Sequence, residues 1–160
     1  MMKFKSAKGF SIVELLIVIA IMGIVGVIGS STFSKSRENR QLREAVGAME
    51  ADLNAAKRRA ISAHVDYTVT VNTTQNTYRI KGGTYDVTKK ISDFGTTIKI
   101  YYSNFPSSGI VFQGRGILLV TGTPPYTGYY ELLLRNKLDS CIHVRVSTMG
   151  RVYRHIHQIK

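Results

Sequence analysis

The sequence has little cysteine, little proline and no tryptophan. Its 160 residues include one Cys and three Pro. A single Cys cannot form a disulfide within the chain, which excludes a small scaffold held together by disulfides. Fourteen Gly residues beside three Pro show no collagen-like or low-complexity bias. A hydrophobic content of 44% argues against intrinsic disorder, and the length fits one domain with its own core.

Acidic residues are also scarce. Ten Asp and Glu accompany 22 Lys and Arg, which gives a formal net charge of +12. A surplus of this size is typical of proteins that bind nucleic acid or anionic membranes. Three of these cations, Lys3, Lys5 and Lys8, lie in the first eight residues, and the rest of the chain carries +9. The start of the chain is Met1 or Met2.

One long apolar run stands out against this basic background. Phe10 to Phe33 comprises 24 residues, and about 20 are enough for a membrane-spanning helix. A secretory signal peptide is the competing interpretation, but its apolar region is normally about 7–15 residues long and ends at an Ala-x-Ala-like site. Neither feature is present. A buried core helix would need a larger domain than this chain supplies.

Glu14 is the only charged residue in the run. A charged side chain at the centre of a membrane helix costs about 3 kcal/mol, so an intramembrane acid is by default a functional residue that needs a partner. The alternative is an acid close enough to the membrane surface to stay hydrated. The position of Glu14 near the start of the run is compatible with both.

The residues around Glu14 resemble the class III signal of type IV pilins and type II secretion pseudopilins. A short basic leader ends in Lys8-Gly9, Phe10 follows, and Glu14 is the fifth residue after Gly9. The resemblance implies that prepilin peptidase cuts between Gly9 and Phe10 and methylates the new amine of Phe10. In that family the acid equivalent to Glu14 pairs with the N-terminal amine of a neighbouring subunit. A cationic partner is also what makes a buried carboxylate tolerable.

The orientation in the membrane follows from the resemblance rather than from charge. Three Lys residues precede the apolar run, and Lys35, Arg37, Arg40 and Arg43 follow it closely, so the positive-inside rule is nearly balanced. The resemblance implies a cytoplasmic N-terminus. We therefore expect a single-pass protein of the cell inner membrane with its C-terminal domain in the periplasm.

After Phe33 the pattern becomes amphipathic. Apolar residues recur at steps of three and four at Leu42, Val46, Met49, Leu53, Ala56 and Ala60. No Pro occurs before Pro106, so one helix is predicted from Phe10 to about Ser62, roughly 80 Å long. Gly23, Gly26 and Gly29 lie on one side of its first half. They either let another helix approach closely or reflect the ordinary tolerance of membrane helices for Gly.

Beyond His64 the sequence predicts strands. Tyr67–Val71 and Thr77–Lys81 form a hairpin pattern closed by Gly82-Gly83. Further strands are expected at Thr97–Tyr102, Ile110–Phe112, Ile117–Val120, Tyr129–Leu134, Ser140–Val146 and Arg151–Ile156, with loops at 106–109 and 121–128. Short strands after one long helix predict an α+β fold, in which an antiparallel sheet packs against the helix.

Four segments follow from these patterns. Residues 1–9 are the prepilin leader, and 10–33 form the transmembrane and assembly helix. Residues 34–63 form its amphipathic second half, and 64–160 form a β-rich, pilin-like periplasmic domain.

No residue set predicts an enzyme, a cofactor or a metal site. Gly114-Arg115-Gly116 lacks the spacing of a dinucleotide fingerprint and the Lys-Ser/Thr of a P-loop, so a turn is expected there. His155 and His157 share a strand face but have no third ligand. Cys141 has no second Cys and is expected to be an ordinary buried strand residue rather than a nucleophile.

The C-terminal half resembles the FimT/GspH group of minor pilins and pseudopilins. The resemblance lies in Gly109–Phe112, Gly114–Gly116, Ile142–Ser147 and Gly150–Val152. It implies a domain that helps to form or initiate a short filament and catalyses nothing. The leading hypothesis is a minor pseudopilin of a type II protein secretion system, with other pseudopilins or pilins as partners.

DNA binding in a type IV pilus is the alternative function. The last 21 residues contain Arg145, Arg151, Arg154 and Lys160 and no acid. DNA-uptake members of the group carry a Gly-Arg-x-Arg motif, whereas Gly150-Arg151-Val152-Tyr153-Arg154 is one residue longer. In a regular strand, Arg151 and Arg154 would point to opposite faces. A solvated basic face is therefore the competing interpretation of Arg151, Arg154 and Lys160.

Overall fold

The computed structural model describes residues 10–119 and 128–159, without the side chains of residues 27–31, 157 and 158. In these residues one long helix, α1 (Ile12–Ala63), is followed by strands and a short 3-10 helix, η1 (Ile91–Asp93). The strands are β1 (Tyr67–Asn72), β2 (Thr77–Gly82), β3 (Tyr85–Lys90), β4 (Lys99–Ser103), β5 (Ile110–Phe112), β6 (Leu118–Leu119), β7 (Tyr129–Arg135), β8 (Cys141–Ser147) and β9 (Val152–Gln158). The chain divides into a first unit, Met1–Ser36, and a second unit, Arg37–Lys160.

Local chemistry sets both ends of α1. The Oγ of Ser11 accepts a hydrogen bond from the amide of Val13 at 3.3 Å, which caps the first turn. At the other end His64 has a left-handed φ of 56°, and its Nδ1 lies 2.7 Å from the carbonyl of Ile61. A left-handed residue after the last turn leads the chain out of a helix. The expected helix from Phe10 to about Ser62 is confirmed to within two residues.

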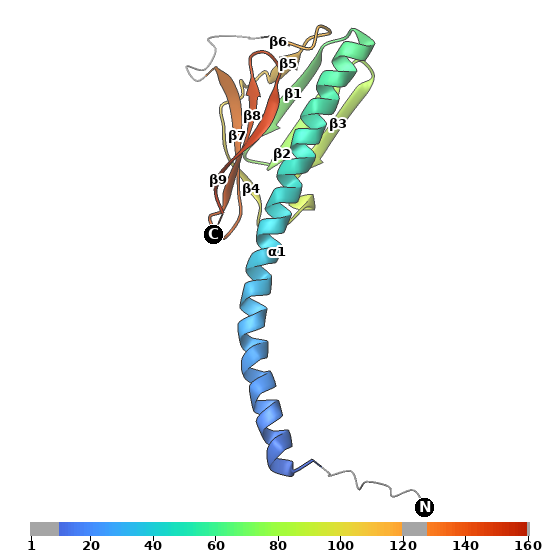
Figure 1. Ribbon diagram of the computed structural model, residues 1–160. Coiled ribbons are helices and arrows are strands. Elements are labelled where there is room, and N and C mark those ends of the chain that lie inside the picture. The colour runs from blue at the N-terminus through green and yellow to red at the C-terminus, as the bar shows by residue number, and fades with distance from the viewer. Residues whose placement is uncertain (1–9, 120–127, 160) are drawn as a thin grey trace, which may run out of the picture. The chain divides into compact units, whose positions relative to one another are not determined.

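The second half of α1 lies at the centre of the second unit's core. All six residues of the expected apolar stripe are buried, and Ala45 is buried with them. The strands β1, β2 and β3 run along this part of the helix (Figure 1), and β1 contributes Val69 and β2 contributes Tyr78 and Ile80 to the same core. Because full burial of a large apolar side chain is worth about 1.5–3 kcal/mol, this stripe fixes α1 on the strands.

The strands form two antiparallel sheets, whereas the sequence suggested one. Their orders are β3-β2-β1-β5-β6 and β4-β7-β8-β9. Asn76 links them, because its Nδ2 donates to the carbonyl of Ile98 at 2.9 Å and its Oδ1 accepts from the amide of Ile100 at 2.8 Å. An alternating pattern predicts one buried face per strand but not which strands pair. The α+β class, with a long helix on antiparallel strands, is confirmed.

The expected strands are all found in part or whole, and one further strand is present. The β1–β2 hairpin has the register Val71 to Tyr78, and the other strand ends lie within two residues of expectation. β3 was not predicted. Gly82 pairs with Tyr85, and Gly83 has a positive φ of 56°, so this glycine pair opens a second hairpin instead of closing the first.

Several expectations fall outside the described residues. These are the leader 1–9 with Gly9, the end of the strand at Val120, residues 121–127 of the expected loop, and Lys160. The turn at 106–109 is confirmed, because the amide of Gly109 donates to the carbonyl of Pro106 at 2.8 Å.

Among the residues described, no helix has an apolar stretch long enough to cross a membrane. The span expected from the sequence, 10–33, includes residues 27–31, whose side chains are outside the description.

Candidate functional site

The first candidate site is the start of α1. The Phe10 side chain is 81% exposed and lies just before the Ser11 cap. Glu14 lies in the first turn of the helix and is also exposed. An acid in the first turn is favoured there because the helix dipole is positive at its N-terminus. Glu14 is the third residue of α1 and the fourth after Phe10, which lies outside the helix.

Exposed apolar side chains follow Glu14 along the described part of the first half of α1. The large exposed ones between Leu15 and Phe33 are Leu15, Leu16, Ile17, Val18, Ile19, Ile21, Met22, Ile24, Val25 and Phe33. A Cβ atom added at Gly23 or Gly26 would meet no atom within 4 Å, so space for a close neighbour is present there. Exposed apolar surface of this extent is typical of a surface that a membrane or other proteins cover.

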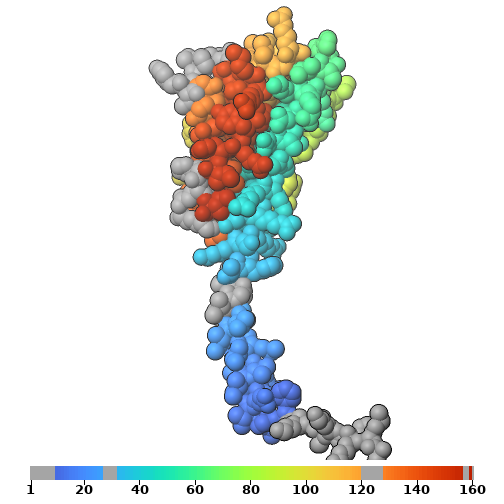
Figure 2. All heavy atoms as spheres, in the orientation of Figure 1, coloured from blue at the N-terminus to red at the C-terminus, as the bar shows by residue number. Residues whose placement is uncertain are grey.

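The two candidate DNA-binding arginines are not brought together. Arg151 lines a surface hollow with Ser147, Met149 and Tyr153. The Nε of Arg154 lies instead 3.5 Å from a carboxylate oxygen of Glu50 on α1. In Figure 2 the residues of β8 and β9, in red, lie directly beside those of α1, in cyan and green. Arg151 lies just before β9 and Arg154 lies within it, and the two side chains have different neighbours.

Cys141, His143 and His155 are the cysteine and histidine residues of β8 and β9 whose side chains the structure describes. Cys141 is half-buried, where full burial was expected, and its thiol donates to the carbonyl of Asp139 at 3.3 Å. The rings of His143 and His155 are 6.3 Å apart, and the side chain of His157 is outside the description. Over the described residues, no group of three or more His, Cys, Asp or Glu could hold a metal ion.

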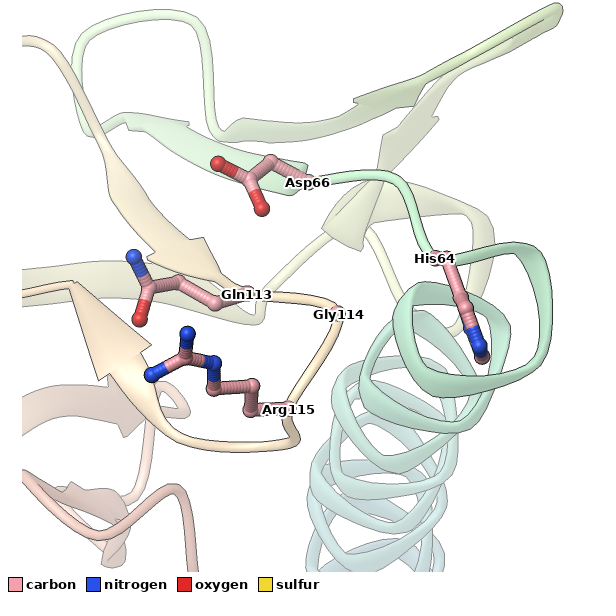
Figure 3. A pocket seen from close by; sticks show the side chains of 5 residues that line it. All are labelled: His64, Asp66, Gln113, Gly114 and Arg115. Carbon is pink, nitrogen blue, oxygen red and sulfur yellow. The ribbon is translucent and has the colours of Figure 1, made fainter.

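The expected turn at Gly114-Arg115-Gly116 borders a polar hollow of about 500 Å³ that the sequence did not reveal. Gly116 has a positive φ of 81°, as a tight turn requires. Figure 3 shows the side chains of Asp66, Gln113 and Arg115 extending into the same space, whereas the His64 ring points away from it. The residues come from the helix end and two strand ends, so only the tertiary structure brings them together.

Asp52 links α1 to the first sheet. One carboxylate oxygen of Asp52 accepts from the Tyr78 hydroxyl at 2.5 Å and from Lys89 Nζ at 2.7 Å. Burial, followed by the hydrogen bond to Asp52, raises the pKa of Tyr78, so the phenol stays protonated and donates. Because Tyr78 is fully buried, its hydroxyl has no solvent to replace Asp52.

Replacing Asp52 with Ala is expected to lower the free energy of unfolding by about 2–3 kcal/mol, because it leaves a buried hydroxyl and an ammonium group without their acceptor. Urea unfolding of the detergent-solubilised full chain measures this. The control is Glu44→Ala, which removes the exposed pair Arg40–Glu44, whose side chains are 81% and 50% exposed, and should cost less than about 0.5 kcal/mol. Equal losses in the two variants would contradict the role given to Asp52.

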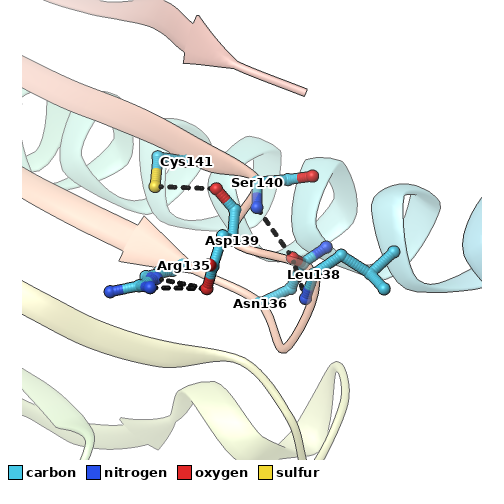
Figure 4. A network of polar contacts seen from close by, with 6 residues as sticks. All are labelled: Arg135, Asn136, Leu138, Asp139, Ser140 and Cys141. Carbon is cyan, nitrogen blue, oxygen red and sulfur yellow. Dashed lines mark hydrogen bonds and ion pairs between the residues drawn. The ribbon is translucent and has the colours of Figure 1, made fainter. Parts of the chain in front are cut away.

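A second polar cluster surrounds the first helical turn of the second unit. Figure 4 shows its outer part, where Asn136 Oδ1 accepts from the amides of Leu138 and Ser140 at 3.0 and 3.1 Å. Asn136 Nδ2 and the Ser140 hydroxyl both donate to Asn39 Oδ1 on α1, at 3.0 and 2.8 Å. The β7–β8 turn is thereby held against the helix.

Glu38 is the buried acid of this cluster. It accepts from the Thr97 hydroxyl at 2.5 Å and pairs with Lys137 Nζ at 2.9 Å. The Thr97 hydrogen bond is the main cause that lowers the pKa of Glu38 below its ordinary value of 4.5, burial opposes it, and Lys137 adds to it. A lowered pKa in the folded state means that the stabilisation exists above pH 4.5 and is lost as the pH falls through the folded value.

Glu38→Gln is expected to destabilise the chain by about 1–2 kcal/mol at about pH 7, because the charged hydrogen bonds are lost. Below pH 4.5 this carboxylate is protonated first in the unfolded chain and only at lower pH in the folded one, so the difference between the two proteins should shrink as the pH falls. Urea unfolding of both full chains at about pH 7 and about pH 3 tests this. A difference that stays constant over this range would rule out Glu38 as its source.

Comparison with known proteins adds to this geometry. Residues 4–30 match the family model described as the prokaryotic N-terminal methylation motif. The motif and the pilin-like arrangement of a long helix on antiparallel sheets define a class of structural filament subunits rather than enzymes. The match covers Gly9, Phe10, Glu14 and most of the apolar run.

The solved structure of the minor pseudopilin EpsH from the type 2 secretion system of Vibrio cholerae is similar in fold. The two share 9% sequence identity with a TM-score of 0.55, over 72% of this chain and 97% of EpsH. At this identity the likeness is one of fold. A comparison with curated proteins gives no significant sequence match.

Proposed function

We propose that the chain is a minor pseudopilin of a type II protein secretion system, made as a prepilin and assembled through the helix that begins near Phe10. One observation carries the proposal. An N-terminal methylation motif at residues 4–30 runs directly into a helix whose apolar side chains are exposed, and that helix continues into a pilin-like domain. The fold likeness to EpsH favours a pseudopilus over other filaments.

The processing steps are assigned to two residues. Prepilin peptidase cuts after Gly9, which leaves 151 of the 160 residues, and methylates the new amine of Phe10. The exposed position of Phe10 before the helical cap keeps this amine accessible to the enzyme. Other pseudopilins or pilins are the partners in the filament.

Glu14 is the assembly residue in this proposal. Its carboxylate pairs with the Phe10 amine of a neighbouring subunit, which neutralises an acid that would otherwise be costly among apolar side chains. Before assembly the helix anchors the subunit in the cell inner membrane. The domain from residue 64 onward then lies in the periplasm.

A type IV pilus subunit that binds DNA is the second candidate. The second unit carries the whole +9 surplus of the processed chain, and Arg151 shares its hollow with an aromatic residue, Tyr153, which suits a nucleic-acid backbone and base. Arg154 is paired with Glu50, which weakens its candidacy, and Lys160 remains a candidate from sequence alone. Charge reversal of Arg151 and Arg154 should reduce DNA binding at matched salt if this function holds.

The two functions are separated by a deletion strain scored for secreted enzymes in the medium and for uptake of labelled DNA. Loss of secretion with normal uptake supports the pseudopilus. Loss of uptake with normal secretion supports the pilus instead. Complementation by the wild-type gene is the control in both assays.

A further inference from the structure

A group of cations and a tyrosine lies beside the first turn of α1 in the second unit. They line a surface hollow of about 470 Å³, which we term the basic hollow. Its residues are Thr96, Thr97, Lys99, Tyr101, Arg135, Asn136 and Lys137. The hollow is open to solvent at Lys99 and Tyr101, both of which are exposed.

The basic hollow is tied to the residue at which the second unit begins. Lys137 and Thr97, two of its lining residues, both contact Glu38, which is the second residue of that unit. Only four residues separate Glu38 from Phe33, the last residue of the apolar run. Even a fully extended chain covers no more than about 18 Å in that interval. Lys137 and Thr97 are therefore restricted to the neighbourhood of the end of the apolar run.

The charge at this place is positive because its acids are already engaged. Glu38 pairs with Lys137, Asp139 with Arg135, and Glu44 with Arg40. Over the described residues, no carboxylate lies within ion-pair distance of Arg37, Arg43 or Lys99. These three cations are available to an external anion.

Tyr101 adds an aromatic side chain to these cations. It is 64% exposed, and the Arg135 guanidinium lies 4.9 Å from its ring centroid. Exposed Tyr together with Lys and Arg is the combination that proteins place at the headgroup level of a membrane. Cationic side chains within a Debye length of an anionic leaflet are attracted to it.

We propose that the basic hollow binds the phosphate of anionic phospholipid headgroups and holds the second unit on the membrane surface before the subunit enters a filament. Lys99 of the hollow contacts the phosphate, and Tyr101 lies among the headgroups. Arg37 does not line the hollow, but it is exposed and precedes Glu38 in the chain, so it supplies a second cation close by. This inference rests on the proposed function in one respect, since it requires that the apolar run anchors the chain in the membrane.

The test uses the full chain in vesicles of phosphatidylcholine alone or with phosphatidylglycerol. The natural sequence has no tryptophan, so Tyr101→Trp supplies a single fluorescent reporter in the hollow. A lipid carrying a quencher near its headgroup should quench this reporter strongly in anionic vesicles and weakly in neutral ones. Met149→Trp is the matched reporter, because Met149 is far from the hollow. The carbonyl of its neighbour Gly150 accepts a hydrogen bond from Lys57, which lies about 28 Å along α1 from Glu38. It should stay unquenched in both.

Charge neutralisation completes the design. Lys99→Gln combined with Arg37→Gln should lower the equilibrium constant for docking on anionic vesicles by more than about tenfold. The quenching of the Tyr101→Trp reporter by these vesicles measures that constant. Lys81→Gln combined with Arg115→Gln removes the same charge elsewhere in the second unit and should leave the quenching unchanged. Equal effects of the two double variants would overturn the site in favour of general attraction.

Flotation of the same vesicles tests the membrane anchor separately from the headgroup site. Chain that floats with the vesicles but shows equal quenching of the Tyr101→Trp reporter with both lipids overturns the headgroup site and leaves the anchor standing. Chain that does not float overturns the anchor as well, and the proposed function with it. A response of this reporter to duplex DNA without one to anionic vesicles overturns the lipid proposal and assigns the hollow to nucleic acid.

Discussion

Glu14→Ala is expected to leave the chain in the membrane fraction but to reduce its incorporation into filaments by at least about tenfold. Removing one partner of a buried charge pair typically costs about 2–5 kcal/mol, because the other charge is left unpaired. Here the unpaired charge is the amine of Phe10 on the neighbouring subunit. The folded second unit is not affected, since Glu14 lies in the first unit and is exposed.

Cross-linking of the variant to its filament partners, beside membrane fractionation, measures the effect. Glu44→Ala is the matched control, because it also removes one exposed acid from α1 and breaks only a surface pair with Arg40. Glu14→Asp keeps the charge and should recover part of the incorporation. Normal co-assembly of Glu14→Ala would contradict the role of Glu14.

Gly9→Val is expected to abolish processing almost completely. In the proposed processing Gly9 is the residue before the cut, and Val adds a branched side chain where Gly has none. The variant should keep its leader, so that intact-mass analysis finds 160 residues instead of 151 with a methylated Phe10. Ala7→Val, two residues away in the same leader, is the control and should be processed normally.

Combining Gly9→Val with Glu14→Ala tests whether Glu14 and the Phe10 amine act as a pair. An uncut chain has no free amine at Phe10, so Gly9→Val should lose incorporation as severely as Glu14→Ala, and the double variant should be no worse than either. Mature protein recovered from Gly9→Val would refute the cleavage assignment. Additive losses in the double variant would instead mean that Glu14 and the amine act independently.

The sequence by itself determined the long helix α1. A run of apolar residues with one acid, bounded by Lys8-Gly9 and followed by a stripe at steps of three and four, is a local pattern, and local patterns are readable because helical geometry is fixed by neighbours in the chain. The burial of Leu42, Val46 and Met49 follows from that periodicity. Most strands were equally readable, since alternation is also a local signal.

Only the tertiary structure decided how the strands are divided between two sheets and which polar side chains meet. The β3 strand was hidden because Gly82-Gly83 reads equally well as the end of one hairpin or the start of another. The contacts of Glu38 with Thr97 and Lys137 span 59 and 99 positions of the chain, and no local rule encodes them. Pairing between distant segments depends on the complementarity of whole surfaces, which a single sequence does not display.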